Sequence, residues 1–162
     1  MTDNLLTCVH AGRMKGDERR EQILAAAVSL FATHGFSGTT TKEIAKAAGV
    51  SEAMVFRHFA NKDALYGAIL ENKTCRDGVH RFPWEENAAV KEAIANKDDY
   101  AFFYNIAVSA LEKHHSDIKF MRLLFYSALE EHELASQFFS DLIARVYEFI
   151  SEYIRVRQAD GA

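Results

Sequence analysis

The segment between residues 35 and 62 constrains the fold of this chain more than any other part of it. It reads GFSGTTTKEIAKAAGVSEAMVFRHFANK. Thr40, followed three residues later by Glu43, matches a capping box, so a helix is expected to begin there. The Ala-Gly pair that follows ends this helix, and Ser51 is a suitable N-cap for another helix, residues 52–59. The segment therefore predicts two short helices joined by a tight glycine turn.

Further helices are predicted on both sides of this pair. Gly35 ends an earlier helix that starts near residue 16, because glycine readily adopts the left-handed conformation of a C-terminal cap. Asn61 is the expected N-cap of a fourth helix, which runs from Lys62 into the seventies. The apolar positions of the earlier helix recur at helical spacing on one face: Ile23, Leu24, Ala27, Leu30 and Phe31.

The rest of the chain reads as longer helices. Residues 81–83 form a break, residues 84–96 a short helix, and three longer helices follow at about 98–114, 117–132 and 134–158. Each of these three is apolar on more than one side, so each needs several neighbours, as in a bundle. No strand-like alternation and no internal repeat is found. The sequence thus predicts an all-α protein.

Charge is distributed unevenly along the chain. The net charge is −4, but residues 1–73 carry nine Lys/Arg against eight Asp/Glu, whereas residues 74–162 carry ten against fifteen. Phosphate should repel the acidic part, so any nucleic-acid contact belongs to the first half of the chain. The outer face of the third helix is suitably polar and basic, and a short helix of this kind fits the major groove of DNA.

The same segments resemble the tetracycline-repressor (TetR) family of bacterial regulators. The resemblance is strong over about residues 19–73, looser afterwards, and rests on several motifs together: Gly35-Phe36, Gly38-Thr39-Thr40, Ile44-Ala45, Ala48-Gly49-Val50-Ser51, His58-Phe59, Lys62-Asp63-Ala64-Leu65, Arg122-Leu123-Leu124 and Leu129-Glu130-Glu131-His132-Glu133-Leu134. It implies an N-terminal three-helix helix-turn-helix domain joined by a fourth helix to a C-terminal antiparallel helical bundle. The expected division is a disordered arm (1–15), a DNA-binding domain (16–62) and a helical ligand-binding and dimerisation domain (63–162).

The resemblance also implies the DNA-contacting residues. The third helix reads bases, and the helix ends grip the flanking phosphates; the expected set is Thr40, Thr41, Lys42, Ser51, Glu52, Ala53, Phe56, Arg57, His58 and Lys62. Glu52 either accepts from the amino group of cytosine or only complements the helix dipole. Two residues depart from the family pattern, because Met54 and Phe56 stand where family members often have hydroxyl side chains. Phosphate anchoring is therefore expected to depend more on His58, Lys62 and the second helix.

A small-molecule effector is a further implication of the resemblance. The second half of the chain is rich in aromatic residues, which suit an apolar or aromatic ligand but are also ordinary core residues. The candidate ligand contacts are Phe102, Phe103, Leu124, Phe125, Leu129, Phe139 and Tyr147. No Arg or Lys lies within an apolar stripe, which argues against a strongly anionic ligand.

Family members usually end with two further helices that form a dimer interface. This sequence stops where the seventh of nine family helices would be finishing, so the expected ligand-binding domain is incomplete. A homodimer remains the expectation, with the last helix and the 117–132 helix as candidate contacts. No apolar run reaches the length of a membrane span and no signal peptide is apparent, so a cytoplasmic protein without membrane contact is expected.

Other classes of function have less support in the sequence. Glu112 and His115 form one Glu-x-x-His pair, but a di-iron bundle needs two such pairs and two further carboxylates. No phosphate loop, zinc spacing or nucleophile motif occurs, so no metal, cofactor or enzymatic activity is expected. The favoured interpretation is a regulator, most simply a repressor, that a ligand releases from double-stranded operator DNA. The alternative is a helical interaction or ligand-binding protein whose DNA binding is weakened or lost.

Overall fold

The computed structural model describes residues 17–76, 79–80 and 82–161, and the expected N-terminal arm lies outside this range. The described residues are almost entirely helical, so the all-α prediction is confirmed. One small hairpin was not expected from the sequence. It consists of β1 (Cys75–Arg76) paired antiparallel with β2 (Val79–His80).

Four helices form the N-terminal part: α1 (Asp17–His34), α2 (Thr41–Ala47), α3 (Glu52–His58) and α4 (Lys62–Thr74). Their boundaries follow the local chemistry of the sequence. Gly35 has φ +76°, as expected for the residue that ends α1. The amide of Ala64 donates to Asn61 Oδ1 at 2.7 Å, which caps α4.

The remaining helices are α5 (Pro83–Glu86), α6 (Ala88–Asn96), α7 (Asp99–Ser116), α8 (Ile118–Leu129) and α9 (Glu133–Ala159). The helix expected at 84–96 is therefore two helices. Asn87 separates them, because its Oδ1 accepts from the amides of Ala89 at 2.8 Å and Val90 at 3.3 Å and so starts a new helix.

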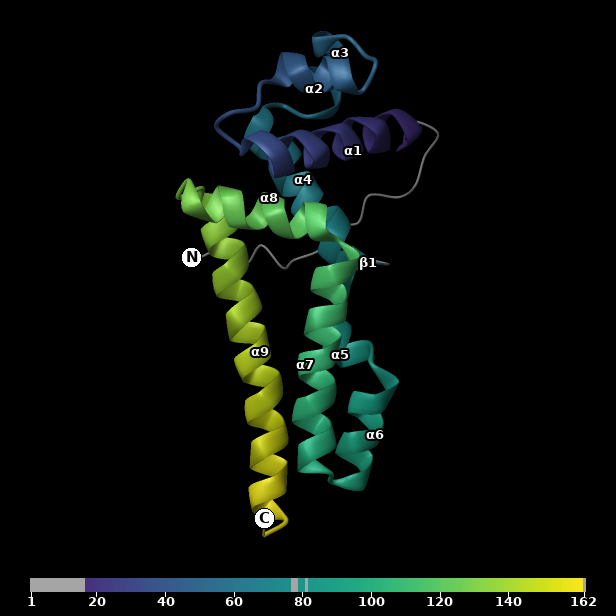
Figure 1. The fold of residues 1–162 in the computed structure, drawn as a ribbon, viewed down its shortest axis with the longest axis vertical. Helices are drawn as coiled ribbons and strands as arrows, with labels where there is room; N and C mark the ends of the chain where they lie inside the picture. The colour runs from purple at the N-terminus through teal and green to yellow at the C-terminus, as the bar shows by residue number, and fades with distance from the viewer. Residues whose placement is uncertain (1–16, 77–78, 81, 162) are drawn as a thin grey trace.

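The molecule is elongated (Figure 1). Helices α1 to α3 lie at one end, and the long helices α7 and α9 run toward the other. Helix α8 lies across the molecule between these two parts and packs against α1. Its position makes α8 the main structural link between the N-terminal helices and the long helices.

The larger of two hydrophobic cores crosses the expected domain boundary at residues 62–63. Phe31, Val55 and Tyr66 belong to it, and so do Leu123 of α8 and Phe138 of α9. A second, smaller core lies among α6, α7 and α9. There the rings of Phe102 and Tyr153 stack with centroids 3.7 Å apart. The N-terminal helices thus share a core with the start of the bundle.

Candidate nucleic-acid interface

The helix-turn-helix is built by the caps that the sequence predicts. The amide of Thr40 donates to Glu43 Oε2 at 2.8 Å, and the amide of Glu43 donates to Thr40 Oγ1 at 3.2 Å, which completes the capping box. Gly49 has φ +67°, the left-handed conformation that the turn requires. Ser51 Oγ then accepts from the amide of Met54 at 3.2 Å and starts α3.

Helix α3 has one buried side and one exposed side. Val55 and the capping residue Phe59 are 1% and 4% exposed, and both belong to the core that contains Phe31 and Ile44. The guanidinium of Arg20 lies 5.2 Å from the centroid of the Phe59 ring. These contacts fix the orientation of α3, so that its other side faces solvent.

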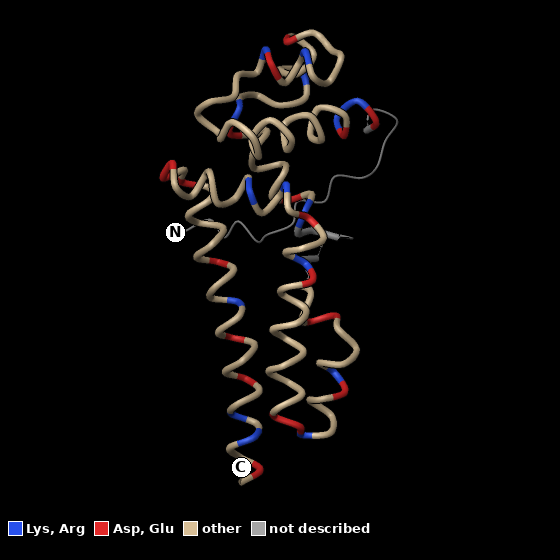
Figure 2. The backbone as a smooth tube through the Cα atoms, viewed as in Figure 1, with Lys and Arg blue, Asp and Glu red and all other residues tan. Residues whose placement is uncertain are grey.

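The exposed side of α3 carries most of the residues expected to read DNA. Ser51, Glu52, Ala53, Phe56 and Arg57 are exposed, and His58 is half-buried. The exposed Lys42 of α2 is on the neighbouring element. In Figure 2, α2 and α3 carry basic and acidic positions close together at the end of the molecule. The structure therefore brings the predicted residues to one end.

Two of these residues bond to each other. Thr41 Oγ1 donates to Glu52 Oε1 at 2.6 Å, which connects the first turn of α2 to the first turn of α3. The Thr40 hydroxyl donates to Glu43 Oε2 at 2.8 Å, so it is engaged within its own helix. Glu52 thus has a structural partner that neither sequence interpretation included, and this bond fixes the position of its carboxylate.

Lys62 has a structural role that the sequence did not indicate. Its Nζ donates to the carbonyl of Phe36 at 2.8 Å and to that of Thr39 at 3.0 Å, and lies 4.2 Å from the centroid of the Phe36 ring. These bonds join the start of α4 to the turn between α1 and α2. A phosphate contact by Lys62 would have to use its remaining donor or replace one of these bonds.

The residues expected to line a ligand site differ in burial. Phe102 and Leu124 are buried, Phe139 is partly buried, and the other four, Phe103, Phe125, Leu129 and Tyr147, are exposed, Leu129 at 83%. None of the seven lines the pocket between α1 and α4, the one between α6 and α9, or the one between α5 and α7. The sequence did not indicate these pockets, because helical periodicity does not show where two neighbouring helices leave a space between them.

The described residues contain no group of three or more His, Cys, Asp or Glu side chains placed to hold a metal ion. Within the same residues, no helix is both long enough and apolar enough to cross a bilayer.

Residues 23–69 match the family model described as bacterial regulatory proteins, tetR family. The chain is 47% identical over 58 residues to the uncharacterised HTH-type transcriptional regulator YvkB of Bacillus subtilis, a match that covers 36% of this chain and 31% of YvkB. It is 42% identical over 59 residues to the HTH-type transcriptional activator FasR of Mycolicibacterium smegmatis, covering 36% of this chain and 27% of FasR. The matches thus span about a third of these relatives.

The fold is similar to that of a solved structure over most of its length. A putative tetR family transcription regulator from Shewanella sp. PV-4 superimposes with a TM-score of 0.57 and 26% identity. The match covers 88% of this chain and 71% of the Shewanella chain. The similarity therefore extends beyond the helix-turn-helix to the helices of the second half.

Proposed function

The chain belongs to the TetR family of bacterial regulators through its N-terminal helices, and on this premise we propose that it regulates transcription. In this proposal the protein binds operator DNA as a dimer, and a small molecule releases it from the DNA. Proteins of this family are regulators and not enzymes. The observation that carries the proposal is the exposed side of α3, held outward by the burial of Val55 and Phe59. A helix presented in this way can enter the major groove.

The proposed contacts divide into two kinds. Arg57 is exposed on α3 and, as a guanidinium, can donate two bonds to guanine or reach a phosphate. Glu52, positioned by Thr41, can accept from cytosine. Lys42 and the amides at the starts of α2 and α3 can contact phosphates, which position the protein without reading sequence.

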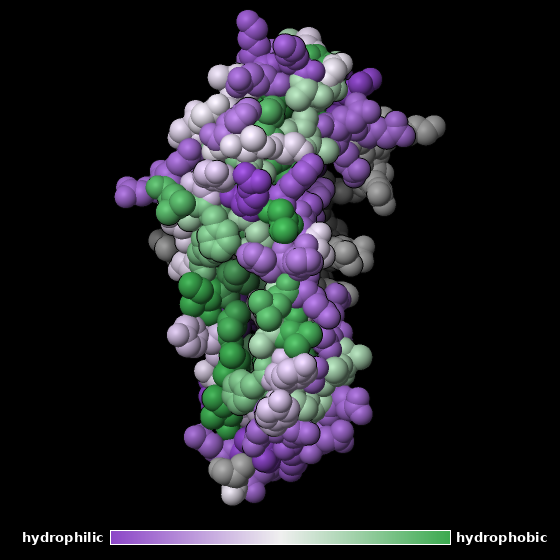
Figure 3. Space-filling model, in the orientation of Figure 1, coloured by the Kyte–Doolittle hydropathy of each residue, from purple (hydrophilic) through white to green (hydrophobic). Residues whose placement is uncertain are grey.

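A homodimer is proposed because one seven-residue helix reads few bases. Two copies can read half-sites about 34–36 Å apart only when a dimer sets the distance between their α3 helices. Exposed apolar side chains on α7, α8 and α9 support a contact between copies. Among them are Phe103 (46% exposed), Phe125 (50%) and Tyr147 (69%), and Figure 3 shows apolar side chains along this face of the molecule.

Selection of tightly bound duplexes from a random pool, followed by fluorescence anisotropy at two salt concentrations, tests the proposal. The wild-type protein should enrich a sequence and bind it far more tightly than random DNA. Arg57→Ala should weaken binding to the selected duplex by about 1–3 kcal/mol and weaken binding to random DNA less. The matched control is Arg155→Ala, because Arg155 is paired with Glu152 near the far end of α9.

Failure to enrich any sequence would contradict the proposal and favour the alternative, an interaction protein that no longer binds DNA tightly. Equal losses on selected and random DNA for Arg57→Ala would leave DNA binding in place but remove Arg57 from base reading.

A further inference from the structure

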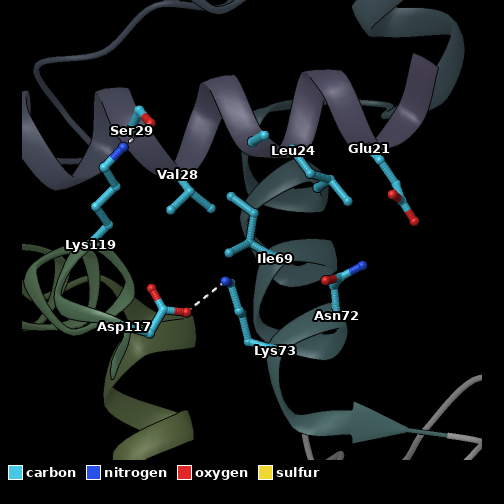
Figure 4. Close-up of a pocket in the computed structure, with 10 residues that line it drawn as sticks. Glu21, Leu24, Val28, Ser29, Ile69, Asn72, Lys73, Asp117 and Lys119 are labelled. Carbon is cyan, nitrogen blue, oxygen red and sulfur yellow. Dashed lines mark hydrogen bonds and ion pairs between the residues drawn. The ribbon is translucent and has the colours of Figure 1, made fainter. Parts of the chain in front are cut away.

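A pocket of about 380 Å³ lies where the N-terminal helices meet the bundle. Its walls come from α1, α4 and the junction between α7 and α8, as Figure 4 shows. The volume falls within the range of small-molecule sites, which is roughly 300–1,000 Å³. The pocket is separate from the aromatic residues of the second half that the sequence suggested.

One part of the pocket wall is apolar. Leu24 and Val28 of α1 and Ile69 of α4 supply the apolar surface, and all three are nearly completely buried. In Figure 4 their side chains point into the space between α1 and α4. An apolar ligand body placed there would lose contact with water and contact aliphatic carbon, which favours binding.

The rim of the pocket is polar and contains two ammonium groups. Lys73 Nζ is paired with Asp117 Oδ2 at 2.6 Å, so its charge is balanced. Lys119 Nζ lies 3.3 Å from the hydroxyl of Ser29. Within the described part of the chain, no carboxylate forms an ion pair with Lys119. The carboxylate of Glu21 also lines the pocket, but it lies on the opposite side from Lys119 in Figure 4. Among the described residues, Lys119 is therefore the lining cation that no carboxylate balances on the α8 side.

We propose that this pocket binds a small amphipathic carboxylic acid, with its carboxylate at Lys119 and its apolar body against Leu24, Val28 and Ile69. The Ser29 hydroxyl can donate to the same carboxylate once Lys119 turns toward the ligand. The proposal names the chemical class of the effector that would control DNA binding. Its regulatory part therefore rests on the proposed function. The proposal also differs from the sequence-based expectation, which was against a strongly anionic ligand.

The position of the pocket connects it to DNA binding. Helix α8 is attached to the N-terminal helices at both of its ends. At the end away from the pocket, Glu130 Oε2 accepts from the amides of Phe36 and Ser37 at 2.9 and 3.0 Å. A ligand between α1 and α4 would separate the helices at one end of α8 while Glu130 holds the other, and so would change the orientation of α3.

Binding is tested on the protein alone with 4-phenylbutyrate as the probe, by titration followed through backbone amide chemical shifts. The largest changes in amide chemical shift should occur at Ser29, Asn72 and Lys119. The uncharged 4-phenylbutyramide should bind roughly threefold to tenfold more weakly, because it lacks the charge-assisted bond. Lys119→Gln should remove this preference for the acid, whereas the exposed Lys91→Gln on α6 should keep it.

A second pair of variants tests the location without altering charge. Ala25 is exposed at the edge of the pocket, so Ala25→Trp should block the space and weaken binding by about tenfold or more. Ala95→Trp, at an exposed position on α6, should bind like the wild type. Shifts centred on α7 and α9, or unchanged binding in Ala25→Trp, would overturn the proposed site.

The regulatory step is tested separately with a duplex that the protein selects. The probe should weaken DNA binding by the wild type and by Lys91→Gln but not by Lys119→Gln. Binding of the probe at the pocket without any effect on DNA affinity would refute the regulatory step and retain the site. Absence of DNA binding altogether would contradict the proposed function, while the amide-shift titration would still decide whether the pocket takes the acid.

Discussion

At the scale of single residues, Tyr66 combines a polar group with complete burial. Its ring is 0% exposed and packs near Phe31 and Phe36. Burial raises the pKa of Tyr66 to about 12, and the nearby Glu130 carboxylate acts in the same direction. The ordinary pKa of a tyrosine is 10.0. The Tyr66 hydroxyl therefore keeps its proton in the folded protein over a pH range in which it loses that proton in the unfolded chain.

This difference predicts a loss of stability in alkaline solution. Between pH 10 and pH 12 the unfolded state binds fewer protons than the folded state, so the free energy of unfolding falls as pH rises, by about 2–3 kcal/mol in all from this group. Tyr66→Phe should lose less stability across the same interval. Urea denaturation of both proteins at pH 9 and pH 11 measures about half of this loss, about 1–1.5 kcal/mol for the wild type. Parallel losses in the two proteins would contradict the prediction.

Lys62 and Glu52 show what the sequence could and could not predict about single side chains. The sequence places Glu52 at the start of α3 and Lys62 at the start of α4, and the structure has both there, because caps and turns fix backbone positions locally. Their hydrogen bonds were not foreseen. Lys62 is 26 residues from the Phe36 carbonyl, and Glu52 is 11 residues from Thr41. Such partners depend on how helices pack, which no local pattern specifies.

At the scale of secondary-structure elements, the turn between α1 and α2 is held by the end of α8. Glu130 accepts from the amides of Phe36 and Ser37, and the ring of His132 packs against that of Phe36 with centroids 4.0 Å apart. Two carbonyls of the same turn, those of Phe36 and Thr39, accept from Lys62 Nζ. One short segment thus connects α1, α4 and α8.

Removal of the Glu130 carboxylate should loosen this turn. Glu130→Ala is expected to lower the free energy of unfolding by about 1 kcal/mol, since two charge-assisted bonds at an exposed site are lost. The amides of Phe36 and Ser37 should then exchange with solvent faster, as hydrogen exchange monitored by NMR would show. Glu112→Ala, which removes an exposed carboxylate on α7, is the control. Unchanged exchange at Phe36 and Ser37 would contradict the assigned role.

The elements themselves were largely predictable where the sequence carries caps. Thr40, Ser51 and Asn61 start α2, α3 and α4 as expected. The division of residues 83–96 into two helices was missed, although Asn87 is a good N-cap, because the apolar periodicity continues across it. The contact between Glu130 and Phe36 spans 94 residues and left no local signal.

At the scale of the whole molecule, α8 joins two parts that the sequence treated as separate domains. The core that surrounds Phe31 and Val55 continues into Leu123 and Phe138, so movement of α8 cannot leave the N-terminal helices unaffected. The uneven charge along the sequence is also uneven in space, because the more acidic second half of the chain forms the long helices that run away from α3 (Figure 2). Repulsion from DNA should therefore orient the molecule with α3 toward the duplex.

The apolar surface of the long helices leads to a prediction about assembly. Tyr147 and Ile143 of α9 are 69% and 52% exposed, and Leu111 of α7 is 69% exposed. Contiguous apolar surface of this kind usually marks a protein interface. Sedimentation equilibrium should therefore find a dimer at tens of micromolar, which requires roughly 6 kcal/mol of association free energy or more.

A charge placed within that surface should separate the copies. Tyr147→Glu would bury a carboxylate without a partner at the interface, so the dissociation constant should rise by about tenfold or more. Lys91→Glu changes an exposed position of α6 that the proposed contact does not include, and the dimer should persist. Tyr147→Glu should also lose affinity for a two-half-site duplex while binding a single half-site like the wild type, since α3 is unchanged. A wild-type monomer at high concentration would exclude a dimer built on this face.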